Sequence, residues 1–434
     1  MSPDVASIDP TSAARLATDG LELRLVDPDG DDLVAWLQAD FRGFHDARVS
    51  VEKVDDWRAA SAERRTVGVF DTDAAEPGTP VATTQTWVAP LTLPGGGQID
   101  LWSIASVTVA PTHRRRGVAR ALLEGELRTA AAHGAPIAGL TVSEATIYGR
   151  YGFGVATFGD DLRIDTRRVT WSGPEPRGRV HFVEPERLLP DARRITAAVR
   201  ASLSGALGHD DFLQGRAIGV LGDEKAKIRT VRYDDADGVP QGFLAYEVRL
   251  HGDDFTKHEA VVWELLGATD EASSALWRFL LELDLVSTVS ASGRPVDDAV
   301  LWQLGDLRAA SRVRKDRLWL RILDVPRVLE ARRYASSAAI VLEVEDALGF
   351  GAGRFLLEVG VDGAGRVRRL DGEGPAGAAS LALTIADLSS ICLGGVAPTQ
   401  LARAGRIVER TPGAALVLGR AFATERAPWL ILGF

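Results

Sequence analysis

The chain has 434 residues, of which 46% are hydrophobic and 25% charged, and its formal net charge is −10. This composition provides apolar cores for roughly two to four domains, and the acidic balance argues against a nucleic-acid partner. The sequence has one cysteine and no apolar run of the ~18 residues that a membrane helix needs, so we expect a cytoplasmic protein without disulfides, bound metal or a membrane partner.

The first part of the chain predicts a mixture of strands and helices. Residues 1–20 lack the basic start and apolar run of a signal peptide, and we expect a disordered extension there. Strand and helix patterns follow in alternation, ending in a helix that stops at a glycine and a further strand, short helix and strand. These segments cover residues 21–26, 33–44, 65–71, 81–111, 116–134 and 136–164. We expect them to form one domain over residues 21–170.

The middle of the chain repeats this layout, which indicates an internal duplication. Its predicted strands and helices lie within residues 180–185, 187–203, 226–235, 242–251 and 258–284. In the first domain, the strand and helix around residues 106–123 are joined by a segment with three arginines and a glycine. The corresponding segment here is ATDEAS, residues 268–273, which is acidic and has no glycine. We therefore expect a second domain over residues 171–325 that lacks the chemistry of the first.

The last part of the chain predicts an α+β domain over residues 326–434. Strands are predicted within 337–346 and 353–374, and helices over 385–394 and 412–423. Cys392 lies among apolar neighbours and is expected to be a small buried hydrophobe. The chain ends on the apolar stretch PWLILGF, residues 428–434, which we expect to be buried.

A positively charged joint connects the strand and the helix in the segment SVTVAPTHRRRGVARALL, residues 106–123. The first N–H groups of a helix lack intrahelical partners and carry partial positive charge. Gly117 allows close approach of the backbone, and Arg114, Arg115 and Arg116 add charge-assisted hydrogen bonds, so the joint is predicted to bind an anion. A solvated basic turn is the alternative. No G-x-x-x-x-G-K-[ST] motif occurs, which argues against a nucleoside triphosphatase.

Two segments resemble the signatures of the GNAT N-acetyltransferases. Residues 114–119 are similar to the R/Q-x-x-G-x-G/A signature, and IYGRYGFG, residues 147–154, resembles the second. VTVAPTHRRRG, SEATIYGRYGFG and LWLRILDVPRVLEARRYA further resemble the Eis (enhanced intracellular survival) family over nearly the whole chain. The resemblance implies an α/β and α+β fold, with two tandem GNAT-like mixed-sheet domains, the second degenerate, and then a sterol-carrier-protein-like domain.

The resemblance also implies acetyl-coenzyme A as cosubstrate, without a metal. The strand before the joint would hold the pantetheine arm, the joint would hold the pyrophosphate, and the N–H of Val109 is our candidate donor to the oxyanion. The implied cofactor-binding residues are Val107, Thr108, Val109, Arg114, Arg115, Arg116, Gly117, Val118, Ala119, Arg120, Ser143 and Glu144.

By the same resemblance, Tyr148 is the general acid and the C-terminal carboxylate of Phe434 is the general base. A phenol of pKa near 10 can protonate a thiolate, and an amine must lose a proton before it attacks. Tyr151 is a competing hydroxyl. His113 and His45 are alternative bases, although we expect His113 to shape the joint.

The acceptor implied by the family is a primary amine of a small cationic molecule, aminoglycoside- or polyamine-like, and the family is hexameric. Aminoglycoside-acetylating members carry an acidic residue where this chain has Gly433, and their substrate-binding aspartate matches Asp46 only after a shift. Trp57 is expected to correspond to a pocket tryptophan. A protein-lysine N-acetyltransferase and a non-catalytic lipid or small-molecule binding protein stay open as alternatives.

Overall fold

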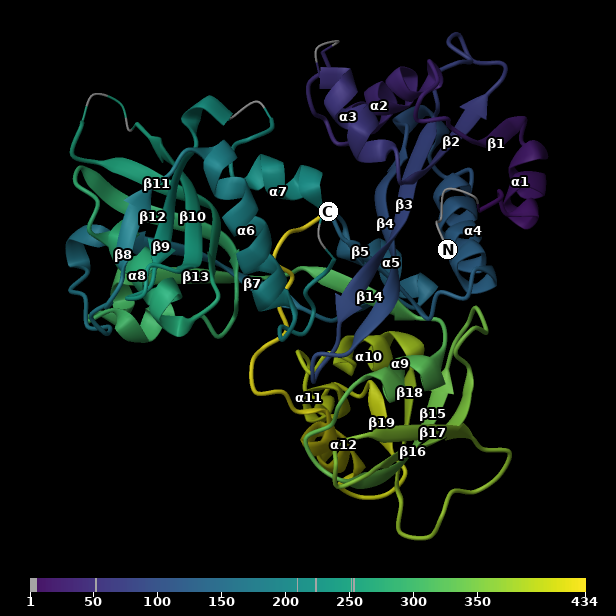
Figure 1. Cartoon of the computed structure of the whole chain (residues 1–434). Helices are drawn as coiled ribbons and strands as arrows, with labels where there is room; N and C mark the ends of the chain where they lie inside the picture. Colours follow the sequence, from purple (N-terminus) through teal and green to yellow (C-terminus); the bar gives the residue numbers. More distant parts are fainter. Residues whose placement is uncertain (1–5, 51–52, 209, 223–224, 251, 253) are drawn as a thin grey trace.

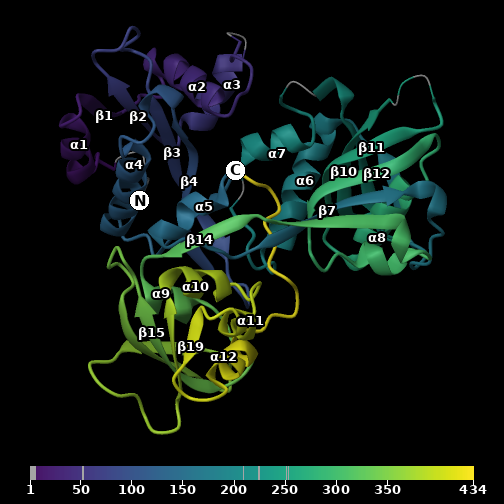
Figure 2. The same ribbon diagram turned by 180° about the vertical axis from the view of Figure 1, so that it is seen from behind.

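The computed structural model describes residues 6–50, 53–208, 210–222, 225–250, 252 and 254–434. The chain forms two seven-stranded sheets and one five-stranded sheet, each with its own helices. Figure 1 shows the first two sheets side by side, with the third body below the first, and Figure 2 shows the same arrangement from behind. None of the described helices is long and apolar enough to cross a membrane.

The first sheet has the strand order β1-β2-β3-β4-β5-β14-β6. Its strands are β1 (Leu21–Leu25), β2 (Arg65–Asp71), β3 (Ala82–Thr92), β4 (Gln98–Val109), β5 (Ile137–Thr141), β14 (Leu318–Ile322) and β6 (Gly154–Val155). The helices of this body are α1 (Pro10–Ala17), α2 (Asp32–Gly43), α3 (Val54–Ser61), α4 (Val118–Ala132) and α5 (Ala145–Tyr148). Only β4 and β5 run parallel, and α4 connects them. Leu123, Leu127 and Ala130 lie on one face of α4 because of their helical spacing, and they join the core beneath it.

The second sheet has the order β13-β7-β12-β11-β10-β9-β8. Its strands are β13 (Ala310–Asp316), β7 (Phe158–Asp165), β12 (Val286–Arg294), β11 (His258–Gly267), β10 (Pro240–Arg249), β9 (Arg229–Asp234) and β8 (Arg179–Phe182), and its helices are α6 (Pro185–Arg200), α7 (Asp211–Ala217) and α8 (Asp270–Leu281). Here α8 connects the parallel pair β11 and β12, as α4 does in the first sheet. The two sheets therefore repeat one topology, which confirms the predicted duplication.

The two sheets exchange one strand each. β7 precedes residue 170 but lies between β12 and β13 of the second sheet, and β14 follows the second domain's strands but lies between β5 and β6 of the first. The predicted boundaries at residues 170 and 325 are therefore wrong for these two strands. The predicted segment 136–164 ends in a strand that overlaps β7, whereas no strand was predicted at β14. In both cases the partner of the strand is set by long-range packing.

The expectation of a disordered extension over residues 1–20 is also wrong for the described part of it, while residues 1–5 lie outside the described residues. Helix α1 packs on α4. The Asp9 side chain caps α1 by accepting from the Ser12 N–H at 2.7 Å, and the Ser12 hydroxyl donates to the Ala121 carbonyl of α4 at 2.6 Å. Arg128 of α4 forms a salt bridge with Asp9 at 2.8 Å, and Leu16 is buried. These long-range contacts stabilise a helix too short to persist alone.

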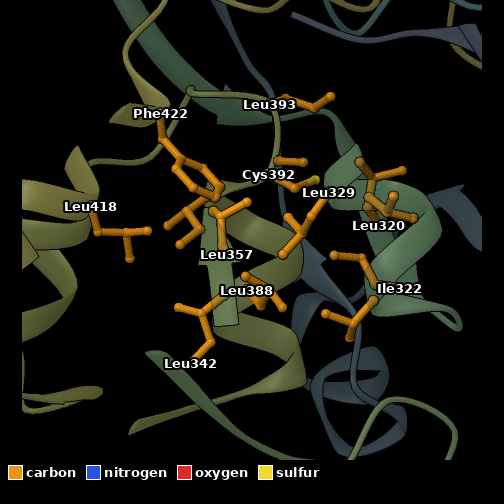
Figure 3. Packing of buried hydrophobic residues seen from close by; sticks show 14 of the residues in the cluster. Leu320, Ile322, Leu329, Leu342, Leu357, Leu388, Cys392, Leu393, Leu418 and Phe422 are labelled. Atoms are coloured by element: carbon orange, nitrogen blue, oxygen red, sulfur yellow. The ribbon is translucent and has the colours of Figure 1, made fainter. Parts of the chain in front are cut away.

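The third body has the strand order β17-β16-β15-β18-β19. Its elements are β15 (Ala338–Glu345), β16 (Gly353–Val359), β17 (Gly365–Arg369), β18 (Ala379–Thr384), β19 (Ile407–Glu409), α9 (Val325–Ala331), α10 (Ile385–Ile391), α11 (Pro398–Arg403) and α12 (Ala414–Phe422). Figure 3 shows Leu342 and Leu357 of its sheet among side chains of α10 and α12, with Leu320 and Ile322 of β14 nearby. The core of the third body is thus continuous with the first sheet. Cys392 is buried in this core, as predicted.

Candidate active site

The first sheet opens between β4 and β5. Their pairing ends at Ser103 and Gly139, although β4 continues to Val109 and β5 to Thr141. Beyond that point Ser106 has a left-handed backbone (φ 55°), and the pairing of β3 with β4 shifts register beside it. Such a bulge bends its strand. The strands therefore diverge and leave unpaired backbone edges facing a gap.

The Val109 N–H faces this gap. The N–H of the next residue, Ala110, donates to the Val81 carbonyl on the β3 side at 2.7 Å. Because successive N–H groups of a strand point in opposite directions, that of Val109 points toward the open side. It is therefore available to a ligand between β4 and β5, whereas the hydroxyl of the neighbouring Thr108 is held by Thr83 at 2.6 Å.

The arginine joint forms the N-terminus of α4. Gly117 precedes the helix in a left-handed conformation (φ 77°), and no side chain caps the first turn. The side chains of Arg114, Arg115 and Arg116 are exposed, whereas that of Val118 is buried in the core, so only its backbone is available to a ligand. A cleft of about 940 Å³ lies over the joint. His113 bonds Asp71 at 2.9 Å and shapes the joint as expected.

The second copy of the joint is closed by its own side chains. The Thr269 hydroxyl accepts from the Ala272 N–H at 3.1 Å and so caps α8. Glu271 in the first turn is acidic, and it accepts hydrogen bonds from Tyr233 at 2.6 Å and from the Arg177 backbone N–H at 2.8 Å. The first turn of α8 is therefore capped by a threonine and carries two acidic side chains, Asp270 and Glu271, which disfavours an anion there.

The apolar tail of the chain runs from the third body into the gap between β4 and β5, and Figure 1 shows the C-terminus between α7 and β5. Trp429 is fixed through its indole N–H to the Gly293 carbonyl at 2.6 Å. At the end, the Thr141 hydroxyl donates to an oxygen of the Phe434 terminus. The Phe434 ring packs edge-on against Trp87, with a centroid distance of 5.0 Å.

One cavity of about 420 Å³ brings together residues that the sequence keeps far apart. Of the predicted site residues, it is lined by Val107, Ser143, Tyr148 and Phe434, and Trp57 also lines it as expected. Tyr151 lines the cleft at the joint instead, with Arg115, Arg116, Gly117 and Arg120. Glu144 is the residue that precedes α5, and its side chain is exposed. The two tyrosines of the IYGRYGFG segment therefore face different spaces.

Tyr148 remains protonated near neutral pH. Only 6% of its surface is exposed, and it stacks edge-on with Phe153 at a centroid distance of 6.2 Å. Burial raises the pKa of its phenol, and the charge of Glu144 raises it further. A protonated hydroxyl is the state that a general acid needs.

Asp40 is a buried carboxyl group in the same cavity that the sequence analysis missed. It is 8% exposed and accepts from the Ser106 hydroxyl at 3.3 Å, and its Oδ1 has no hydrogen-bond partner among the described residues. Burial raises its pKa to about 7, while Ser106 opposes the shift and Asp46 adds to it. The available signal was its spacing, because Asp40 follows Leu33, Trp36 and Leu37 on the apolar face of α2.

The second domain supplies one wall of the cavity. Arg64 forms a salt bridge with Asp210, just before α7, at 2.5 Å and lies over the Trp87 ring at 4.3 Å. Phe212 of α7 stacks on Trp57 with a centroid distance of 4.8 Å. The salt bridge neutralises the Arg64 charge, so the pocket combines aromatic walls with the carboxyl groups of Asp40 and Phe434 and the guanidinium of Arg216.

Sequence comparisons agree with this arrangement. Residues 26–156 and 211–322 each match an acetyltransferase (GNAT) domain, and residues 325–431 match a sterol carrier protein domain. An uncharacterized N-acetyltransferase of Streptomyces coelicolor is 34% identical over 92% of this chain and 97% of that protein. N-acetyltransferase Eis of Mycobacterium tuberculosis is 35% identical over 77% of this chain and 81% of its own length. The chain belongs to the Eis family of GNAT N-acetyltransferases.

A solved structure supports this family assignment. Eis1 from Mycobacterium abscessus superimposes with a TM-score of 0.78 at 27% identity, covering 95% of this chain and all of that one. The expected architecture of two GNAT domains and a sterol-carrier-protein-like domain is therefore confirmed, as is the N-acetyltransferase class. GNAT acetyltransferases take their acetyl group from acetyl-CoA, and the open edge of β4 with the uncapped α4 suits that ligand.

Proposed function

We propose that this Eis-family enzyme transfers acetyl from acetyl-CoA to a primary amine of a small cationic molecule, aminoglycoside- or polyamine-like. The observation that carries the proposal is the hydrogen bond from Thr141 to the Phe434 terminus, beside Tyr148 in one cavity. Asp40 supports a cationic acceptor, because a buried carboxyl oxygen without a partner gains most from an ammonium ligand.

In the proposed mechanism the Phe434 carboxylate removes a proton from the acceptor ammonium, which must become neutral to attack. The neutral amine adds to the thioester carbonyl and forms the N–C bond, and the Val109 N–H donates to the oxyanion of the tetrahedral intermediate before the C–S bond breaks. Tyr148 then donates its proton to the departing thiolate, and the nitrogen, still protonated after the addition, gives up its extra proton to restore the Tyr148 hydroxyl. The products are the acetylated amine and free coenzyme A, and the proton taken by the carboxylate passes to solvent. The remaining predicted cofactor residues around the joint would bind the pyrophosphate.

Release of free coenzyme A tests the proposal. Acetyl-CoA is offered with a panel of aminoglycosides, diamines and lysine peptides, and we expect release with at least one small amine. Activity confined to the lysine peptides would instead support a protein-lysine acetyltransferase. No release with any acceptor would overturn the proposed enzyme activity.

Two changes test the proposed catalytic groups. Tyr148→Phe should lower kcat about 100-fold or more, because the thiolate then lacks its acid. Deleting Phe434 should do the same, and adding one glycine after Phe434 should match the deletion, since it keeps every side chain but moves the carboxylate. Thermal unfolding checks that each variant is folded. Full activity of either chain-end variant would exclude the terminal carboxylate as base.

We also propose a cytoplasmic homohexamer, as the family resemblance implies. Sedimentation velocity tests the assembly, and a monomeric protein at working concentration would contradict it.

A further inference from the structure

Helix α1 places Arg15 in the cleft over the arginine joint, hereafter the coenzyme cleft. α1 precedes residue 26, where the match to the acetyltransferase domain begins. The Arg15 guanidinium lies directly over the joint, where its Nη2 would be 2.6 Å from a Cβ on Gly117. A side chain at residue 117 would have to displace the end of the Arg15 side chain. The N-terminal helix therefore reaches the one segment expected to bind phosphate.

The cleft over the joint carries an excess of positive charge. It is lined by five arginines and two acidic residues: Arg15, Arg115, Arg116, Arg120, Arg150, Asp19 and Glu124. Arg120 forms a salt bridge of 2.6 Å with Glu124 through its Nε and is otherwise exposed. Within the part of the chain that the structure describes, no carboxylate forms a salt bridge with Arg15, Arg115 or Arg150. Uncompensated guanidinium groups in one cleft favour a ligand with several negative charges.

Three of these arginines, Arg15, Arg120 and Arg150, line the cleft together with Tyr151. Burial raises the pKa of the Tyr151 phenol, and the positive charges of Arg150, Arg120 and Arg15 oppose that shift. The three come from different elements: α1, α4 and the short 3₁₀ helix Gly149–Tyr151. They line the same cleft as Arg115 and Arg116 of the joint, so the cleft offers enough guanidinium groups for a second phosphate besides the pyrophosphate.

We propose that Arg15, with Arg120 and Arg150, binds the ribose 3′-phosphate of coenzyme A, which makes the N-terminal helix part of the cofactor site. The inference rests on the proposed function, in which the joint holds the pyrophosphate. Coenzyme A carries a second phosphate group, a monoester on the ribose. Guanidinium groups bind such a group through paired, charge-assisted hydrogen bonds.

Arg15 can bind the phosphate only while α1 is folded and packed on α4. The salt bridge of Asp9 with Arg128 and the Ser12 hydrogen bond to Ala121 fix α1 against the same helix that begins at the joint. Arg15 lies on the next turn of α1 from Ser12, so its position depends on these contacts. A ligand held by Arg15 should in turn stabilise α1.

Calorimetric titration with three ligands tests the inference: coenzyme A, 3′-dephospho-coenzyme A and 4′-phosphopantetheine. The wild type should bind coenzyme A about tenfold or more tightly than the dephospho form. Arg15→Gln should weaken coenzyme A about tenfold and the dephospho form less than twofold. Arg167→Ala, an exposed arginine on the second body, should change neither affinity and controls for the lost charge.

The possible results separate this inference from the proposed function. Equal weakening of both coenzymes by Arg15→Gln would assign Arg15 to the pyrophosphate and overturn the inference. Unchanged binding of both would overturn it as well. A wild type that binds none of the three ligands would overturn the proposed function too. Circular dichroism and thermal unfolding show whether Arg15→Gln keeps α1.

Discussion

The hydroxyl of Thr141 donates a hydrogen bond to the terminus of Phe434, although 293 residues separate the two. Thr141 is the last residue of β5 in the first sheet, and Phe434 arrives on a tail from the third body. The bond thus fixes the carboxylate beside Tyr148. It also connects the third body to the cavity that Tyr148 lines.

Thr141→Val should lower kcat about tenfold, because a hydrogen bond to a charged group contributes roughly 1.5–3 kcal/mol and its loss frees the carboxylate. KM for acetyl-CoA should change less than about twofold, since the cofactor residues are untouched. Thr141→Ser keeps the hydroxyl and should retain the wild-type rate within about threefold. Steady-state kinetics of the wild type and both variants measure kcat and KM. A Thr141→Val enzyme with the wild-type kcat would show that this hydrogen bond does not position the base.

Asp40 should make the stability of the protein fall as pH rises. Burial raises its pKa from 3.8 to about 7, so the folded protein keeps a proton that the unfolded chain releases. The free energy of unfolding therefore decreases by about 4 kcal/mol between about pH 4 and about pH 7. Above about pH 7 this contribution no longer changes. Asp40→Asn removes this contribution. Urea unfolding at about pH 4 and about pH 8 should show a smaller difference for the variant.

Comparing the wild type with Asp40→Asn isolates the contribution of Asp40 to the pH dependence of stability. Burial also raises the pKa of Glu264 to about 8, which has the same sign, but this residue is present in both and cancels. Equal pH dependence in wild type and Asp40→Asn would contradict the raised pKa of Asp40.

Much of the fold could be predicted because its patterns are local. Strand alternation, the helical spacing of Leu123 and Leu127, and the glycine after the arginines all lie within short windows. That Tyr148 and Phe434 line one cavity could be inferred only from the resemblance to the Eis family. Neither residue carries a mark of catalysis in its own surroundings.

The missed features depend on contacts between distant segments. The exchange of β7 and β14 between the sheets could not be predicted from either strand, because a strand's own pattern does not identify its partner. Arg15 joins the cleft only because α1 packs on α4. Asp40 was detectable as an acid on the apolar face of α2, which is a common sign of a functional carboxyl group.

Gly117→Ala should weaken coenzyme A binding, and Gly134→Ala is its matched control. The two glycines flank the same helix α4 with φ of 77° and 73°, so alanine should cost each about 1 kcal/mol of stability. A Cβ on Gly117 would meet the Arg15 guanidinium at 2.6 Å, whereas one on Gly134 meets nothing within 4 Å. Calorimetry should therefore show weaker binding for Gly117→Ala alone. Equal binding by both variants would contradict the role of the joint.

The buried ion pair of Arg321 and Asp346 should be the most sensitive connection between the first and third bodies. Arg321 of β14 binds both carboxylate oxygens of Asp346, at 2.7 and 2.8 Å, and its Nε donates to the Tyr151 carbonyl at 2.8 Å. The side chains are 0% and 1% exposed. Asp346→Ala should therefore destabilise the protein by about 3–5 kcal/mol, because it leaves a buried charge without its partner.

Replacing both partners separates the charge effect from packing. Arg321→Met with Asp346→Leu removes the charge and fills similar volume, so the double variant should be more stable than Asp346→Ala alone. Asp346 also accepts from the Leu348 N–H at 3.1 Å, and Leu348 lines the cleft over the arginine joint. Since we propose that coenzyme A binds in this cleft, both variants should bind coenzyme A more weakly. Urea unfolding and calorimetry measure the two effects. A double variant as unstable as the single one would show that the loop geometry, rather than the buried charge, dominates the connection.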